Sequence, residues 1–140
     1  MLWEDIPFAL PPVGNLRWKA PRAFINTNSN IKPTNNNFCH QEIGGEIQEI
    51  NQEGNEDCLY LDIRAPHKFR DNLPVMFWIH GGGNTSGHKD FYDFTELVKK
   101  KDVIVVSVNY RLGPLGFFTH PAIQDLNSGL DKTSNFGTLE

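Results

Sequence analysis

The chain has 140 residues, of which 39% are hydrophobic and 21% charged, and its formal net charge is −4 at pH 7. This composition is typical of a globular protein with a core and excludes a disordered chain, and the scattered basic residues form no stripe that would bind nucleic acid. The longest apolar runs are too short to cross a bilayer, so we expect no membrane span.

Residues 7–38 contain five of the nine prolines and seven asparagines. Pro11, Pro12 and Pro21 prevent a long helix, because proline lacks the backbone N–H and disfavours helical geometry in the residue before it. We therefore expect this segment to be extended and irregular.

Cys39 and Cys58 flank 18 residues that are rich in Gly, Asn, Gln and Glu, a composition typical of a loop. A disulfide across this loop would stabilise the fold by roughly 3 kcal/mol in the chain-entropy model. The alternative is a pair of reduced, half-buried thiols. The spacing alone leaves both possibilities open, because two cysteines are weak evidence of oxidation.

Three segments after the cysteine loop have the pattern of β-strands. Residues 59–64 alternate apolar and polar side chains toward their end, and a turn is expected near Asp71 and Asn72. Residues 75–79 and 103–108 are continuous apolar runs that are rich in β-branched residues. The segment between them, residues 91–101, has apolar side chains at helical spacing.

These patterns predict an α/β fold with a β-α-β unit over residues 74–108. Continuous apolar strands joined by a helix indicate a parallel sheet that is covered on both faces, with a right-handed crossover. Ligands bind such sheets at the carboxyl ends of the strands.

His80, Gly81, Gly82 and Gly83 follow directly after the strand predicted at residues 75–79. Consecutive glycines can turn their backbone N–H groups toward a carbonyl oxygen that becomes negative during acyl transfer, where side chains would block the approach. The loop is therefore a candidate oxyanion hole, and the alternative is a tight turn without a chemical role. No serine lies in a Gly-x-Ser-x-Gly elbow, which would present a nucleophile opposite such a hole.

Four motifs occur in the order found in one known family. They are IPFALPPVGNLRW at residues 6–18, EDCLYLDI at 56–63, PVMFWIHGGG at 74–83 and NYRLGPLGFF at 109–118, with a weaker fifth match, NFGTLE, at 135–140. With these motifs the chain resembles the N-terminal part of a type-B carboxylesterase, the cholinesterase-like family of α/β-hydrolases. The resemblance implies a mostly parallel sheet. It also implies that residues 1–140 are a partial domain, incomplete at both ends.

The resemblance implies a carboxylic ester hydrolase of the serine type. In the family the second and third glycines, here Gly82 and Gly83, provide two of the three oxyanion donors. We expect Gly81 and His80 to support the loop, because the general base of the family lies far downstream. Without nucleophile, acid and base, residues 1–140 alone are expected to be inactive. The alternative is a cholinesterase-like binding or adhesion protein that kept the scaffold and lost its catalytic triad.

Two pairings are also implied by the resemblance. In relatives, cysteines at the positions of Cys39 and Cys58 form a disulfide at the base of a loop that borders the active-site gorge, and residues matching Arg17 and Glu56 form an ion pair. A disulfide indicates an oxidising compartment, so the complete protein is expected to be secreted or otherwise extracytoplasmic. The expected partner is a small carboxylic ester. No cofactor or metal is expected, because the other histidines lack ligand spacing.

Two departures from the family pattern concern specificity. Asn84 follows the glycines where an apolar residue is common, which would place an amide near the acyl pocket. Residues 48–50 (Gln-Glu-Ile) stand where true cholinesterases have a tryptophan whose face holds a quaternary ammonium group. A general carboxylester hydrolase is therefore favoured over one specialised for choline esters.

Overall fold

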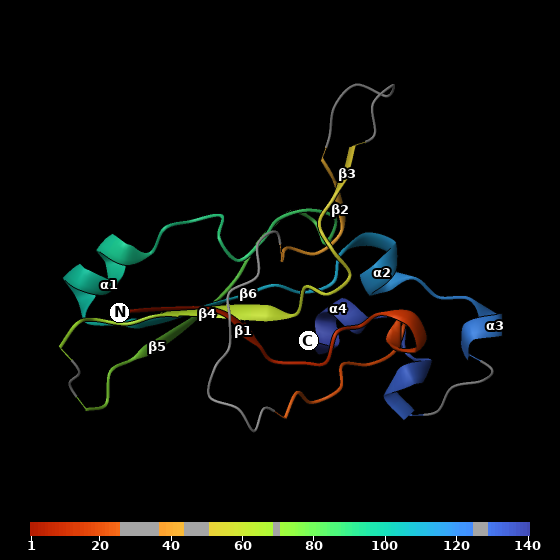
Figure 1. Cartoon of the computed structure of the whole chain (residues 1–140), viewed down its shortest axis with the longest axis horizontal. Coiled ribbons are helices and arrows are strands. Elements are labelled where there is room, and N and C mark those ends of the chain that lie inside the picture. Colours follow the sequence, from red (N-terminus) through yellow and green to blue (C-terminus); the bar gives the residue numbers. More distant parts are fainter. Residues whose placement is uncertain (26–36, 44–50, 69–70, 125–128) are drawn as a thin grey trace.

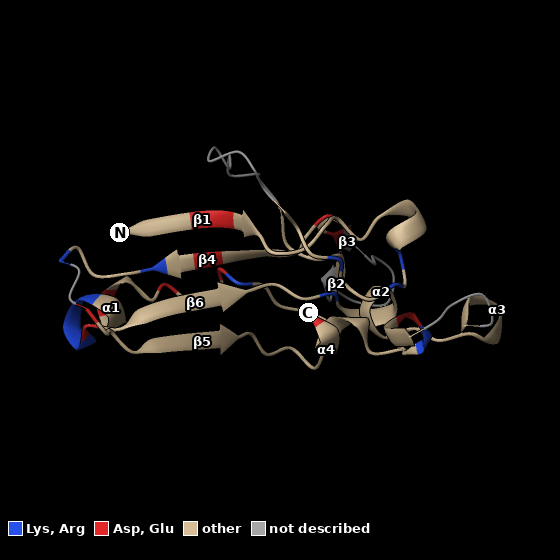
Figure 2. Cartoon of the chain, turned by 90° about the horizontal axis from the view of Figure 1, so that it is seen from below, with Lys and Arg blue, Asp and Glu red and all other residues tan. Residues whose placement is uncertain are grey.

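The computed structural model describes residues 1–25, 37–43, 51–68, 71–124 and 129–140. Its larger sheet has four strands in the order β1-β4-β6-β5, which lie side by side in Figure 2. In that order the strands are β1 (Leu2–Pro7), β4 (Tyr60–Arg64), β6 (Ile104–Val108) and β5 (Val75–Ile79). The strands predicted after the cysteine loop are all present, and their ends differ from the prediction by at most one residue.

The predicted β-α-β unit is confirmed. β5 and β6 pair in parallel, with Phe77 opposite Val106, and α1 (Thr95–Lys101) connects them. The helix begins at Thr95 rather than at residue 91, because the carboxylate of Asp93 accepts a hydrogen bond from the N–H of Thr95 at 2.9 Å. Such a local bond competes with an earlier helix start. The helix ends at Lys101, and the residue that follows, Asp102, adopts the left-handed conformation with φ 48°.

The sheet is mixed rather than mostly parallel, because β4 pairs antiparallel with both β1 and β6. The sequence pattern did not predict β1. Its pairing with β4 shifts register between Trp3 and Ile6, and Asp5 has φ 56°, so the strand lacks a regular alternation. The α/β class is unchanged by this correction.

One face of β5 is bare, although we expected cover on both faces. Val75, Phe77 and Ile79 are 61%, 57% and 62% exposed. On the other face, Trp78 packs edge-on against the ring of Phe94, with centroids 5.1 Å apart. Within this chain the face on the side of Phe94 is therefore covered, and the opposite face of β5 carries an exposed apolar row.

The smaller sheet is an antiparallel pair, β2 (Gln41–Ile43) and β3 (Asn51–Glu53), which projects away from the main sheet in Figure 1. Short helical segments gather at the end of the molecule opposite α1 (Figure 1): η1 (Gly14–Leu16), α2 (Gly113–Phe117), α3 (Pro121–Gln124), η2 (Gly129–Lys132) and α4 (Phe136–Leu139). Among the described residues, no helix has the length and apolar character needed to span a membrane.

A cluster of buried core residues lies beyond the carboxyl end of β6. Leu59, immediately before β4, and Tyr110 and Leu112, after β6, pack with the two cysteines and Ala9. Because β5 runs parallel to β6, the glycine loop leaves the sheet at this same edge. This cluster therefore lies at the end of the sheet from which the candidate oxyanion loop emerges.

Candidate functional site

The glycine loop forms a tight turn directly after β5. Gly82 has φ +118° and Gly83 φ +61°, values that residues with side chains rarely adopt. The carbonyl of Gly82 accepts hydrogen bonds from the N–H groups of Thr85 and Ser86, at 3.1 and 3.2 Å. A Cβ on Gly82 would lie 2.0 Å from the carbonyl oxygen of Ser86, whereas one on Gly83 would meet nothing within 4 Å. Of these two positions, 82 therefore requires glycine for space as well as for conformation, and 83 for conformation alone.

The amide groups of this loop are available to a ligand. Gly82 and Gly83 are exposed, and within the described part of the chain their N–H groups donate no hydrogen bond. The next residue, Asn84, anchors the turn, since its carbonyl accepts from the N–H of Gly113 at 2.7 Å. Unpaired N–H groups on an anchored turn are the donors that can stabilise a developing oxyanion.

His80 is buried at the base of the loop, with 4% of its surface exposed. Its ring stacks on that of Tyr110, with centroids 4.4 Å apart, and the Tyr110 hydroxyl donates to the His80 carbonyl at 2.8 Å. Nδ1 lies 2.9 Å from the carbonyl of Gly81, which can only accept, so Nδ1 carries the proton. Burial lowers the pKa of His80 and favours the neutral ring. Its contacts hold the backbone on both sides of the loop entrance.

Gln41 connects the loop to the cysteine segment, a contact that the sequence did not reveal. Its amide nitrogen donates to the carbonyls of Cys39 and Gly87, both at 3.0 Å, and its oxygen accepts from the N–H of Gly87 at 2.8 Å. Gly87 closes the glycine loop. A polar residue two positions after a cysteine carries no signal of such a partner, because Gly87 is remote in sequence.

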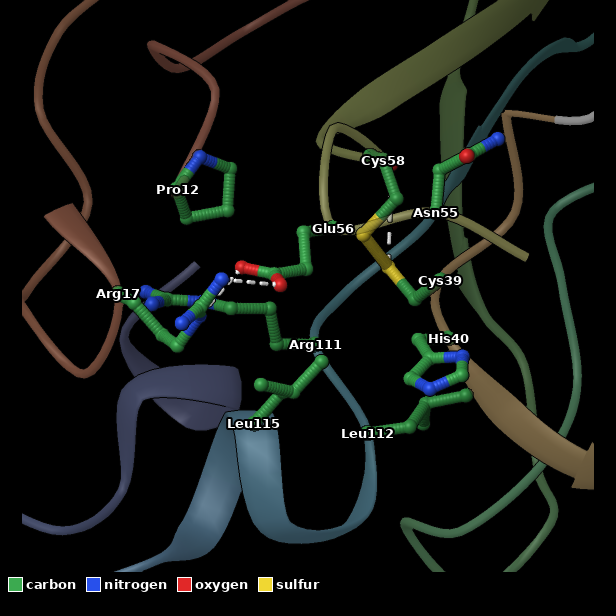
Figure 3. Close-up of a pocket in the computed structure, with 10 residues that line it drawn as sticks. All are labelled: Pro12, Arg17, Cys39, His40, Asn55, Glu56, Cys58, Arg111, Leu112 and Leu115. Carbon is green, nitrogen blue, oxygen red and sulfur yellow. Dashed lines mark hydrogen bonds and ion pairs between the residues drawn. A yellow bond between two sulfur atoms is a disulfide. The ribbon is translucent and has the colours of Figure 1, made fainter. Parts of the chain in front are cut away.

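Cys39 and Cys58 form a disulfide, as the resemblance implies. Nearby, Arg17 and Glu56 face each other and form two side-chain hydrogen bonds of 2.7 and 2.6 Å, drawn dashed in Figure 3. The hydrogen bond and charge of Glu56 raise the pKa of Arg17. The pair joins the N-terminal segment to the residues just before the second cysteine.

A second ion pair, between Arg111 and Glu140, was not predicted. The Arg111 N–H donates to Glu140 Oε2 at 2.7 Å, and its Nε also contacts the carboxylate. Arg111 Nη2 donates to the carbonyl of Lys19 at 2.8 Å. Burial raises the pKa of Glu140, although the positive charge of Arg111 opposes this. The weak fifth motif, residues 135–140, is thereby attached to the residues that follow β6.

A buried charge cluster surrounds the side chain of Lys89, two residues after Gly87. The ammonium of Lys89 is 3.0 Å from Asp5, 2.9 Å from Asp62 and 2.7 Å from Asp90. The Lys89 and Asp62 side chains are 3% and 0% exposed. Burial raises the pKa of Asp62 to about 6, a rise to which its hydrogen bond with Asp90 contributes. No local sequence pattern indicates this cluster, because its members come from β1, β4 and the segment after Gly87.

A concave surface that encloses a volume of about 620 Å³ lies beside the loop. Its wall includes Gln41, Trp78, Gly82, His88, Phe91 and Tyr92. The mixture of aromatic side chains and loop backbone could accommodate an organic group next to the Gly82 amide. Residues 48–50, on which the choline-ester argument depends, lie outside the described residues. Among the described residues, no group of three or more His, Cys, Asp or Glu is placed to hold a metal ion.

Comparison with known proteins gives one consistent result. A sequence model of the carboxylesterase family matches residues 1–130. The fumonisin B1 esterase of Sphingopyxis macrogoltabida is 41% identical over 144 aligned residues, which cover 96% of this chain and 25% of that protein. The para-nitrobenzyl esterase of Bacillus subtilis (strain 168) is 40% identical over 121 residues, 82% of this chain and 24% of that protein.

Solved structures agree with the sequence comparison. A structure of PNB esterase superposes with a TM-score of 0.77 and 35% sequence identity, covering 99% of this chain and 28% of that one. The chain thus spans about a quarter of the length of the curated relatives named above.

Proposed function

Because this chain belongs to the carboxylesterase family, we propose that it provides the oxyanion-binding part of a serine-type carboxylic ester hydrolase. Its fold matches the N-terminal part of the α/β-hydrolase PNB esterase. Residues 1–140 are proposed to be part of one carboxylesterase domain. The substrate is proposed to be a small carboxylic ester that binds in the concave surface beside Gly82.

The observation that carries this proposal is the pair of exposed amides at Gly82 and Gly83, whose N–H groups donate to no other described residue. In the proposed mechanism an ester carbonyl lies against this turn, and both N–H groups donate to its oxygen as negative charge develops during nucleophilic attack. His80 and Gly81 hold the entrance of the turn. They are supporting residues in this proposal, because the neutral, buried ring of His80 is engaged with the carbonyl of Gly81.

The attacking serine, the acid and the base are proposed to come from sequence other than residues 1–140. No serine of this chain lies in a Gly-x-Ser-x-Gly elbow. Oxyanion donors alone supply no nucleophile, so the 140-residue chain by itself is proposed to be inactive. The disulfide supports a proposed location in an oxidising, extracytoplasmic compartment.

A chimera tests the proposal. Residues 1–140 replace the matched segment of the Bacillus subtilis para-nitrobenzyl esterase, and hydrolysis of a short-chain aryl ester is measured. We expect a folded, active chimera, in which Gly82→Ala lowers kcat about 100-fold or more through loss of donor geometry. The Lys100→Met variant, altered on the exposed surface of α1, is the matched control and should keep full activity.

Three outcomes would contradict the proposal. One is a purified 140-residue chain that hydrolyses the ester and is blocked by a serine reagent. Another is a Gly82→Ala chimera with unchanged kcat. A chimera that unfolds cooperatively yet has no activity would favour the alternative, a binding protein that retains the scaffold without catalysis.

A further inference from the structure

Gln41 is the only described side chain that forms hydrogen bonds to both the disulfide segment and the end of the glycine loop. Its three hydrogen bonds fix the orientation of the carboxamide. The N–H of Gly87 needs the amide oxygen, while the carbonyls of Cys39 and Gly87 need the nitrogen. Turning the amide over would lose all three bonds, so the side chain is held in one orientation.

Gly87, which forms two hydrogen bonds with the Gln41 side chain, packs directly against the loop entrance. It has φ +112°, and a Cβ there would lie 2.4 Å from Nδ1 of His80 and 2.5 Å from the carbonyl oxygen of Gly81. The Gly87 backbone therefore touches the two residues that precede Gly82. A displacement of Gly87 would be passed to the backbone that presents the Gly82 and Gly83 amides.

The other end of the Gln41 contact is fixed. Cys39 is 2% exposed and Cys58 0%, and the disulfide joins them within the core. The backbone of Cys39 also pairs with that of Asn55 in an isolated parallel β-bridge. Gln41 thus connects a buried, disulfide-bonded segment to an exposed turn whose conformation depends on positive φ angles.

We propose that Gln41 is a positioning residue, which holds Gly87 so that the Gly82 and Gly83 amides stay directed at the ester carbonyl. The proposal rests on the function proposed above for these two glycines. Gln41 also lines the concave surface. A direct contact with substrate would change KM, whereas a positioning role changes kcat with little effect on KM.

The first experiment uses the 140-residue chain with ¹⁵N-labelled glycine and needs no activity. Gln41→Met removes every hydrogen bond at similar size. We expect the Gly87 amide to exchange at least 10-fold faster, and the order parameters of Gly82 and Gly83 to fall from about 0.85 to about 0.6 or below. Gln124→Met, which removes the hydrogen-bonding glutamine at the end of α3, is the matched control and should change none of these values.

Gln41→Glu gives a readout that a general loss of stability would not produce, and it decides the question if Gln41→Met does not fold. The ionised carboxylate can only accept, but the protonated acid can accept from Gly87 and donate to one carbonyl. Protection of the Gly87 amide should therefore recover as pH falls through the pKa of the introduced carboxyl, while the wild-type chain shows no such step. A missing step, or unchanged Gly82 and Gly83 order parameters in Gln41→Met, would overturn the proposal.

The second experiment measures catalysis in the chimera. Gln41→Met should lower kcat about 10- to 100-fold and change KM less than twofold, because a small displacement of reacting groups is costly. A rise in KM at constant kcat would overturn the positioning role in favour of substrate contact. If the wild-type chimera is inactive, the proposed function fails, and the glycine amide measurements still decide whether Gln41 positions the loop.

Discussion

The ammonium of Lys89 lies 2.9 Å from the carboxylate of Asp62, and both side chains are almost completely removed from solvent. Lys89 follows the glycine loop, and Asp62 is in the middle of β4. The pair therefore attaches the segment after the loop to the main sheet. Asp5 in β1 and Asp90 complete the surroundings of the ammonium.

Replacing Lys89 by Met should destabilise the chain by about 3–5 kcal/mol, because the buried carboxylates of Asp62 and Asp5 would lose the ammonium that lies within 3.0 Å of both. Urea unfolding measures the loss. Lys100→Met is the control: its ion pair with Glu96 is exposed, so its unfolding free energy should change by less than about 1 kcal/mol. Equal losses of unfolding free energy in the two variants would show that the buried cluster stabilises the fold no more than an exposed ion pair does.

The pKa of Asp62 should make stability depend on pH in a defined direction. Its pKa of about 6 in the folded protein exceeds the ordinary aspartate value of 3.8, so between these values the folded protein binds the proton more tightly. The contribution of Asp62 to the unfolding free energy is therefore present below about pH 4 and is lost as pH rises toward 6. Asp62→Asn cannot titrate and keeps an oxygen that can accept from Lys89.

The measurement compares Asp62→Asn with the wild type at pH 4.5 and pH 7. The variant should gain stability relative to the wild type as pH rises between these values. Asp90 contributes in the opposite direction, because its hydrogen bonds with Asp62 and Lys89 lower its pKa despite burial. That contribution is lost only as pH falls below the ordinary aspartate value of 3.8, outside the range of this measurement. A difference that stays constant from pH 4.5 to 7 would contradict the assignment.

The sequence predicted the parts of the fold that local patterns determine. Continuous apolar runs identified β5 and β6, and helical spacing identified α1, because these signals depend on neighbours in sequence. The start of α1 was placed four residues early, since the side chain of Asp93 decides it. β1 was missed because Asp5 breaks the alternation.

The candidate site divides in the same way. The glycine loop was found from its composition and its place after a strand, and the family resemblance supplied the disulfide and the Arg17 to Glu56 pair. The contacts of Gln41 with Gly87, of Lys89 with Asp62 and of Arg111 with Glu140 were not found. Each joins residues far apart in sequence, and no local pattern encodes which distant group a polar side chain meets.

The two oxyanion glycines should respond differently to alanine. Gly82→Ala should prevent the native turn, because the new Cβ meets the Ser86 carbonyl and φ is +118°. Gly83→Ala should cost only about 1–2 kcal/mol, since φ +61° is within the left-handed region and the space is open. Thermal unfolding of both variants tests whether Gly82→Ala is the more destabilising. A Gly83→Ala variant as unstable as Gly82→Ala would contradict the prediction.

Reduction of the disulfide should destabilise the chain by roughly 3 kcal/mol, the value expected for closing a loop of this length. The cysteines are separated by 19 positions in sequence. Urea unfolding with and without a reductant measures the difference. The Cys39→Ala, Cys58→Ala double variant is the control, and it should unfold at the same urea concentration with and without reductant.

The bare face of β5 has a consequence for how this polypeptide behaves in a cell or a test tube. Figure 2 shows no charged residue on β5 or β6, and the exposed row on β5 alternates Val, Phe and Ile along the edge of the sheet. Short uncharged segments of this kind nucleate intermolecular strand pairing. The isolated polypeptide should therefore self-associate increasingly as its concentration rises. A lysine introduced at Phe77 should raise its solubility limit without touching the glycine loop.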